Sequence, residues 1–181
     1  MAHFNVLKGE YPGLAQLDKT LPALATEADI VRGSVLVIES GCFRRCIAAD
    51  HGTKDTVAGV VVYHAFQAQT DPDAVMAGGV TAMPCIAPVE IETDQFVANQ
   101  GIVPGAYLMT AGAGHAAHTN DGKLTLHTDG LCAVGLVTKA SYKRWSNTAT
   151  PAGGSYPSAR QGAMIDVIAF WSMFVPNLLL A

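Results

Sequence analysis

Apolar and polar positions alternate most clearly between residues 89 and 108. The segment VEIET at 89–93 alternates apolar with polar side chains, which is the period-two pattern of a half-buried strand. A turn-rich stretch follows and ends on VPGA at 103–106, after which YLM at 107–109 forms a second apolar run. This order of strand, polar loop, Pro-Gly corner and strand is typical of an all-β domain.

The same order of strand-like runs separated by turn residues recurs along most of the chain. Runs of apolar or alternating residues, bounded by Gly, Pro, Asn and Asp, predict further short strands. We expect these strands at residues 35–38, 42–49, 58–63, 80–83, 123–127, 132–137 and 164–175. The sequence therefore predicts a compact all-β fold, either a β-barrel or a sandwich, with an extended N-terminal arm and a C-terminal apolar strand.

Turn signals connect the predicted strands. Ser40 and Gly41 are predicted to turn the strand at 35–38 into a hairpin with 42–49. The segment DPDA at 71–74 predicts a turn or a single helical turn that begins at Asp71.

Two of the strands carry features of a sheet edge. Pro84 and Pro88 bracket residues 85–86, so the strand at 80–83 is predicted to be bent or to lie at an edge. Glu90, Glu92 and Asp94 place three like charges on one strand face. Such a row can bind a cation or act as paired acids, but it is more typical of the solvated face of an edge strand.

The chain divides into three predicted parts. Residues 1–28 form an N-terminal arm, 29–140 the β-barrel or sandwich core, and 141–181 a Gly/Ser/Pro loop followed by the apolar C-terminal segment. Gly and Pro interrupt the arm, yet it carries many large apolar side chains. We therefore expect the arm to lie on another surface, either that of its own domain or that of a neighbouring subunit.

The C-terminal segment is open to two interpretations. Apolar residues on both faces permit a helix, but the β-branched residues and the preceding Gly-rich loop favour a strand. The uncharged run at 167–181 has 15 residues and contains Pro176, whereas a membrane-spanning helix needs about 20 apolar residues. We therefore expect a core or interface segment and no contact with a membrane.

Composition adds one expectation about association. Half of the 181 residues are apolar and 14% are charged, which indicates an ordered domain with a weakly charged surface. Such a surface is expected to be covered in part by copies of the chain or by another protein. The net charge of −4 argues against nucleic-acid binding, and Lys139, Lys143 and Arg144 are more typical of a solvated edge than of a phosphate site.

The cysteines and the histidines give few candidates for chemistry. Cys42, Cys46, Cys85 and Cys132 contain no CxxC pair and are interpreted as free thiols, mostly buried. No secretory leader is visible, so synthesis in a reducing cytoplasm is expected.

His115 and His118 are spaced to chelate a metal on a helix, but their Gly- and Ala-rich surroundings favour a loop. We predict no catalytic residue, no cofactor and no metal; a metal-binding or enzymatic β-barrel using this pair is the alternative.

A recurring set of short motifs resembles a known class of proteins. DIVRGSVLVIESGCFRRCIAAD is followed by AGVVVYHAF, EIETDQF, VPGAYLMTAGAG, DGKLTLHTDG and AVGLVTKA. Over residues 29–140 this order is similar to that of the capsid decoration, or cement, proteins of tailed bacteriophages. Residues 1–28 and 141–181 have no counterpart in the resemblance.

The resemblance implies a virion structural protein without catalytic activity. Such a protein binds the outer surface of the major capsid protein lattice, commonly as a trimer of identical copies, and stabilises the head. It is made in the host cytoplasm and ends on the outside of the capsid. The long uncharged C-terminus leaves another virion component, a tail-tube or tail-tip subunit, as an alternative. The expected contact residues with the capsid or a second subunit are Phe4, Tyr11, Leu14, Leu17, Leu21, Trp171 and Phe174.

Overall fold

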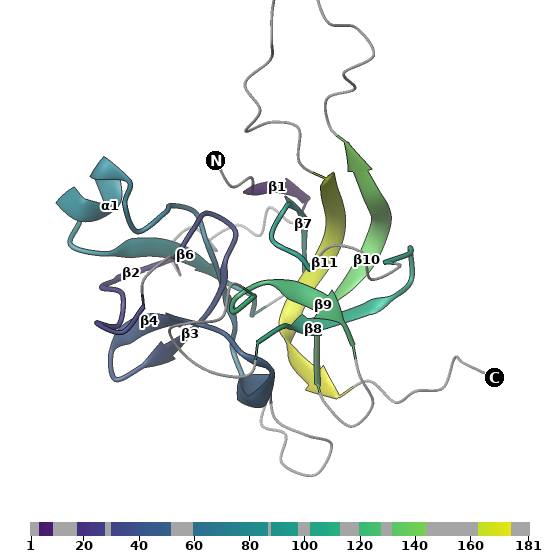
Figure 1. Ribbon diagram of the computed structural model, residues 1–181, viewed down its shortest axis with the longest axis horizontal. Coiled ribbons are helices and arrows are strands. Elements are labelled where there is room, and N and C mark those ends of the chain that lie inside the picture. Colours follow the sequence, from purple (N-terminus) through teal and green to yellow (C-terminus); the bar gives the residue numbers. More distant parts are fainter. Residues whose placement is uncertain are drawn as a thin grey trace, which may run out of the picture.

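The fold is two packed antiparallel sheets. The computed structural model describes residues 4–8, 18–27, 30–51, 60–86, 88–97, 102–112, 120–127, 132–143 and 163–174. Within these residues the sheets are not closed into a barrel, so the all-β prediction is confirmed and the sandwich is the form the structure takes (Figure 1).

Sheet A contains six strands from both ends and the middle of the chain. Their spatial order is β1 (Phe4–Lys8), β7 (Val89–Thr93), β11 (Ala163–Phe174), β10 (Cys132–Lys143), β8 (Tyr107–Thr110) and β9 (Leu124–Leu126). The C-terminal segment is thus a strand, as the β-branched residues favoured, and it lies between β7 and β10.

Sheet B contains five strands from the first half of the chain. Their spatial order is β2 (Lys19–Leu21), β6 (Val80–Pro84), β5 (Tyr63–Ala65), β3 (Val35–Glu39) and β4 (Cys42–Arg45). A 3-10 turn, η2 (Ala48–His51), follows β4, and the short helix α1 (Pro72–Met76) precedes β6. Of the strand predicted at 58–63, residues 58–59 lie outside the described residues. Within the described part, β5 begins at Tyr63, because residues 63–65 are the ones in register with β3 and β6.

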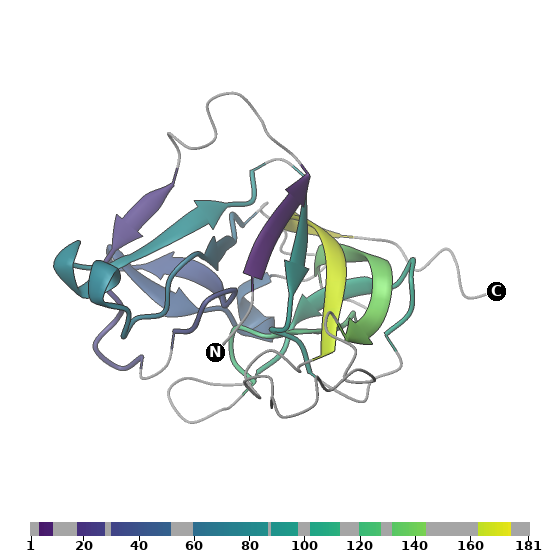
Figure 2. The same cartoon turned by 90° about the horizontal axis from the view of Figure 1, so that it is seen from above.

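The main hydrophobic core lies between the two sheets. Sheet B contributes Val35 and Met83, and sheet A contributes Ile91, Leu108 and further buried residues of β10 and β11. Burial of these side chains from water is the main force that holds the sheets together. Figure 2 shows the sheets from above, with β1 beside β7.

Sheet B is covered on its other face as well. A second cluster contains Leu36, Phe43 and Val80, together with Ile30 from the segment before β3. Leu21 of β2 packs against this cluster. Because β3 contributes Val35 to one cluster and Leu36 to the other, its sequence is a continuous apolar run rather than an alternating one.

The hairpin between β3 and β4 forms as predicted. Glu39 pairs with Cys42, which leaves Ser40 and Gly41 as a two-residue loop. Both have positive φ, 51° at Ser40 and 78° at Gly41. Positive φ at both central residues is the requirement of a type I′ turn, whose twist matches that of the flanking strands. The return strand ends at Arg45, earlier than the predicted residue 49, because η2 follows.

Both strands with predicted edge features, the acidic strand at 89–93 and the strand at 80–83 that was predicted to be bent or to lie at an edge, are interior strands. β7 lies between β1 and β11, and β6 lies between β2 and β5. The edge prediction was wrong because residues 4–8 and 19–21 of the predicted arm add one strand to each sheet. The described parts of the arm therefore lie on their own domain, which is one of the two surfaces that the sequence left open.

A close backbone approach at Gly79 gives the first testable prediction. A Cβ atom at this position would overlap the carbonyl group of Leu21 and come within 2.7 Å of the nitrogen of Pro22. Gly79→Ala is therefore expected to lower the free energy of unfolding by about 2–3 kcal/mol, because backbone atoms cannot give way as a flexible side chain can. Chemical denaturation monitored by circular dichroism measures the loss.

The neighbouring Gly78 provides the control for this substitution. It has a φ of 73° but open space around the added Cβ, so Gly78→Ala carries only the backbone strain of about 1 kcal/mol. A smaller loss at Gly79 than at Gly78 would show that β2 does not approach β6 this closely.

Candidate functional site

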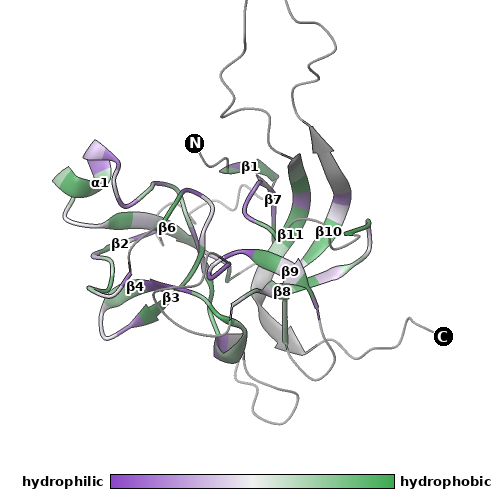
Figure 3. Cartoon of the chain, viewed as in Figure 1, coloured by the Kyte–Doolittle hydropathy of each residue, from purple (hydrophilic) through white to green (hydrophobic). Residues whose placement is uncertain are grey.

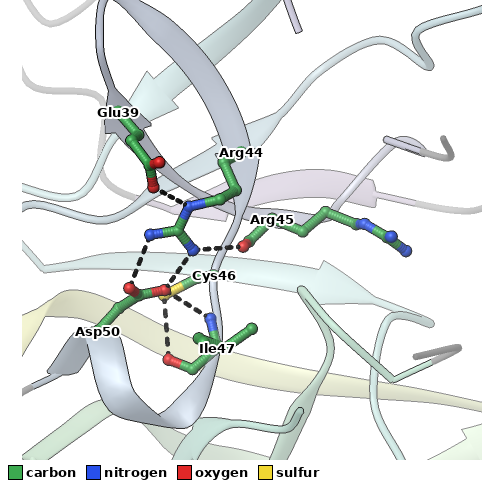
Figure 4. A network of polar contacts seen from close by, with 6 residues as sticks. All are labelled: Glu39, Arg44, Arg45, Cys46, Ile47 and Asp50. Carbon is green, nitrogen blue, oxygen red and sulfur yellow. Dashed lines mark hydrogen bonds and ion pairs between the residues drawn. The ribbon is translucent and has the colours of Figure 1, made fainter. Parts of the chain in front are cut away.

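A network of polar contacts joins β3, β4 and η2 (Figure 4). Arg44 on β4 donates two parallel hydrogen bonds of 2.8 Å to the carboxylate of Asp50, and its Nε donates at 2.5 Å to Oε2 of Glu39. Asp50 also accepts the backbone N–H of Ile47 at 2.7 Å. Paired, bidentate contacts of this kind are the strong form of a charge-assisted hydrogen bond.

The electrostatics of Arg44 indicate a structural role for the network. The hydrogen bonds that Arg44 donates to Asp50 raise the pKa of Arg44 above its ordinary value, and burial acts in the opposite direction. The side chain is 8% exposed, and the hydrogen bonds to Asp50, Glu39 and the Arg45 carbonyl occupy the guanidinium. Arg44 therefore holds η2 against β4, and the network leaves little of the guanidinium for an external anion.

Arg45 forms a second ion pair away from this network. Its Nε donates at 2.7 Å to Oε2 of Glu27, whose side chain is 1% exposed. Successive strand residues point to opposite faces of a sheet, which explains why Arg44 and Arg45 find different partners. The pair connects β4 to the loop that follows β2.

The cysteines are free thiols, as interpreted from the sequence. Cys46, Cys85 and Cys132 are buried and Cys42 is half-buried. Burial raises the pKa of Cys46 and raises that of Cys85 to about 12. Both therefore remain protonated near neutral pH and are poor nucleophiles.

The acidic row at 90–94 is not uniformly solvated: Glu92 is buried, and Glu90 and Asp94 are half-buried. Glu92 is 5% exposed and lies opposite Asp166 of β11 in the strand register. Glu90 accepts a hydrogen bond of 3.0 Å from Thr138, and Asp94 accepts one of 2.6 Å from Gln95. Among the residues the structure describes, no group of three His, Cys, Asp or Glu side chains is placed to hold a metal ion.

His64 is a buried polar residue to which sequence analysis assigned no functional role. It lies on β5 and is 0% exposed, with its ring stacked on that of Phe4 at a centroid distance of 5.6 Å and an interplanar angle of 12°. Its Nδ1 donates to the Gly33 carbonyl at 3.4 Å, and Nε2 has no hydrogen-bond partner within the described structure. Burial lowers the pKa of His64 to about 4, and the Gly33 carbonyl opposes this shift.

The predicted contact residues have different positions. Phe4 was predicted to contact the capsid or another subunit, but this prediction is corrected. The side chain is 2% exposed because its ring packs in the core between the two sheets. Leu21 is half-buried against the second cluster of sheet B. Trp171 and Phe174 lie on β11, where the structure describes only their backbone.

Several other predicted residues lie outside the described residues. These are Tyr11, Leu14, Leu17, His115, His118 and Arg144. Lys139 lies on β10 opposite Asp166 in the register and is exposed, in keeping with a solvated position.

The described surface also carries large apolar side chains. Met76 is 87% exposed and Val75 is 67% exposed, both on α1, and Val103 is 56% exposed beside the Pro-Gly corner. Figures 1 and 2 place α1 at the end of sheet B that is away from sheet A, and Figure 3 colours part of this helix as hydrophobic. We call Val75 and Met76 the α1 tip.

Sequence reasoning missed both His64 and the α1 tip. The signal that could have found His64 is the two-residue period of a strand, which places it on the same face as positions 62 and 66. In the structure Val62 is buried and Phe66 packs on the core. The helical turn was predicted, but Asp71 does not cap it with its side chain and accepts the N–H of Ala68 at 2.9 Å instead. No local pattern showed which face of so short a helix is exposed.

Comparison of the chain with protein-family models, with curated proteins and with solved structures finds no match. In the described part of the chain, none of the helices is long and apolar enough to cross a membrane.

Proposed function

We propose that the chain is a virion structural protein of a tailed bacteriophage, a capsid decoration protein that binds the outer surface of the major capsid protein lattice and stabilises the head. Copies of the chain associate with one another, most simply as a trimer. The proposal includes no catalytic step, cofactor or nucleic acid.

The motif order and the structure's surface support this proposal. The motifs of the resemblance coincide with β3 and β4, the Gly105 corner before β8, and β9 and β10. The observation that carries most weight is the α1 tip, because two adjacent apolar side chains with exposures of 67% and 87% favour burial against another protein. Repetition over a lattice makes a modest contact of this kind sufficient for stable attachment.

Particle binding tests the proposal. Expanded phage heads that lack this chain are incubated with the purified protein, and electron microscopy locates it. We expect ordered density on the outside of the head. Density on tails, or absence of the chain from purified virions, would contradict a decoration role.

Substitution of the α1 tip is expected to weaken attachment without unfolding the domain. Burying a Val or Met side chain contributes about 1.5–3 kcal/mol, so the double variant Val75→Ser, Met76→Ser is expected to bind heads at least about tenfold more weakly. Its melting temperature is expected to stay near that of the parent, because both side chains are exposed. Titration of heads with labelled protein measures the affinity.

Asp73→Ser is the matched control, since Asp73 is exposed on the same helix. It is expected to bind as the parent does. Equal weakening by both variants would show that α1 contributes through its charge or its folding, and not through its apolar side chains.

A further inference from the structure

His64 lies where β1, the turn before β3 and sheet B meet. Phe4 from β1 stacks on the ring, and the carbonyl of Gly33 accepts its Nδ1–H. Val35 and Met83 are its partners in the registers of β3 and β6. The ring is thus enclosed by apolar side chains and one carbonyl group.

Phe4 connects β1 to sheet B. Its ring contacts His64 in a stacked arrangement and Phe66 edge-on, with a centroid distance of 5.7 Å to the latter. Among the described strands, β1 pairs with β7, and its register shifts between Val6 and Lys8. A five-residue edge strand with an irregular ladder depends strongly on such side-chain packing.

Among the described side chains, the charged groups of β3, of the turn before it and of β7 do not face the His64 ring. Glu39 of β3 binds Arg44, and Arg32 in the turn before β3 is exposed. Glu90 and Glu92 of β7 alternate with the core-facing Ile91 and so point to the other face of sheet A. Burial, and not a neighbouring charge, is the cause that disfavours the protonated ring.

We propose that His64 is an acid-sensitive latch for the N-terminal strand. When the ring takes up a second proton, its Nε2–H finds no acceptor among the described residues. The imidazolium becomes hydrated by displacing Phe4, and β1 separates from β7 while the rest of the sandwich stays folded. The inference does not depend on the proposed capsid role.

The direction of the pH dependence follows from proton linkage. The pKa of His64 is about 4 in the closed state and about 6.5 once the ring is exposed. Between these values the open state binds one proton more than the closed state. The stabilisation of the closed state by the neutral ring is therefore complete above pH 6.5 and is lost as the pH falls towards 4. Over this range the equilibrium constant for opening rises about tenfold for each pH unit that the pH falls.

Hydrogen exchange of the full chain tests the latch. Protection factors, corrected for the intrinsic pH dependence of exchange, are compared between pH 7.5 and pH 5 for the amides of β1 and for those of the β10–β11 pair. We expect β1 to be less protected than β10–β11, and its protection to fall by about 30-fold over this interval. This range avoids most carboxyl titration.

Two substitutions of His64 and one control complete the test. His64→Gln and His64→Phe do not titrate, so β1 protection in either variant is expected to lose the 30-fold dependence. His127→Gln, at a half-buried histidine after β9, is expected to retain it. If neither His64 variant folds, the pH dependence of β1 protection relative to that of β10–β11 in the unmodified protein decides whether the latch exists.

Either of two results would overturn the proposal. Protection of β1 that does not change between pH 7.5 and 5 would show that its opening does not expose His64. Protection of β1 equal to that of β10–β11 at every pH would show that the strand leaves only when the whole domain unfolds.

Discussion

Glu27→Gln is expected to lower the free energy of unfolding by about 3–5 kcal/mol, as measured by urea denaturation near pH 7. The substitution keeps the size of the side chain but removes the negative charge that faces Arg45 at 2.7 Å. With exposures of 1% for Glu27 and 8% for Arg45, the remaining guanidinium is left without a counter-charge in a place that water does not reach. Losses of this size are typical when one partner of a buried ion pair is removed.

Two further variants separate the lost charge from other effects. Glu39→Gln removes a carboxylate whose side chain is 46% exposed, from an arginine that keeps its paired bonds to Asp50, so a loss below about 1 kcal/mol is expected. The double variant Glu27→Leu, Arg45→Met is expected to recover most of the stability, because replacing both charges removes the desolvation cost. Equal losses for Glu27→Gln and Glu39→Gln would contradict the burial of the Arg45 pair.

Phe4→Ala is expected to lower the free energy of unfolding by about 3–5 kcal/mol. Phe4 is 2% exposed and its ring fills the space between His64 and Phe66. Truncation removes its buried apolar surface and leaves a cavity between the two sheets, and both effects destabilise the folded state. Thermal and urea unfolding of the purified variant provide the measurement.

Leu7→Ala is the matched control on the same strand. Leu7 is 40% exposed, so its truncation is expected to cost much less than that of Phe4. If the two substitutions have equal and small effects, β1 is a peripheral arm that the core does not need, and residues 1–28 contribute to attachment alone.

The fold class was predictable because strand patterns are local. Alternation at 89–93, the β-branched run at 164–175 and the Ser40–Gly41 turn each depend on a few neighbouring residues, and all three are present as β7, β11 and the β3–β4 hairpin. The boundary of β5 was not predictable in this way, because the register with the distant strands β3 and β6 selects residues 63–65 from a longer apolar stretch.

The candidate site was much less predictable from sequence. Glu27 and Arg45 are 18 positions apart, and the Phe4–His64 contact joins residues 60 positions apart in two different sheets. No local pattern encodes such pairs. The exposure of the α1 tip depends in the same way on which face of the helix the domain leaves uncovered.

By itself the amino-acid sequence determined the type of structure: short strands, a Gly-containing hairpin turn, a weakly charged surface and a C-terminal strand. Only the tertiary structure decided which strands are interior, because hydrogen bonding between strands is not local. Two short segments near the N-terminus, at 4–8 and 19–21, pair with β7 and β6 and so cover strands whose charges and prolines are typical of edges. That pairing also brings Phe4 onto His64, since the face of a strand that is buried is set by its register with its neighbour.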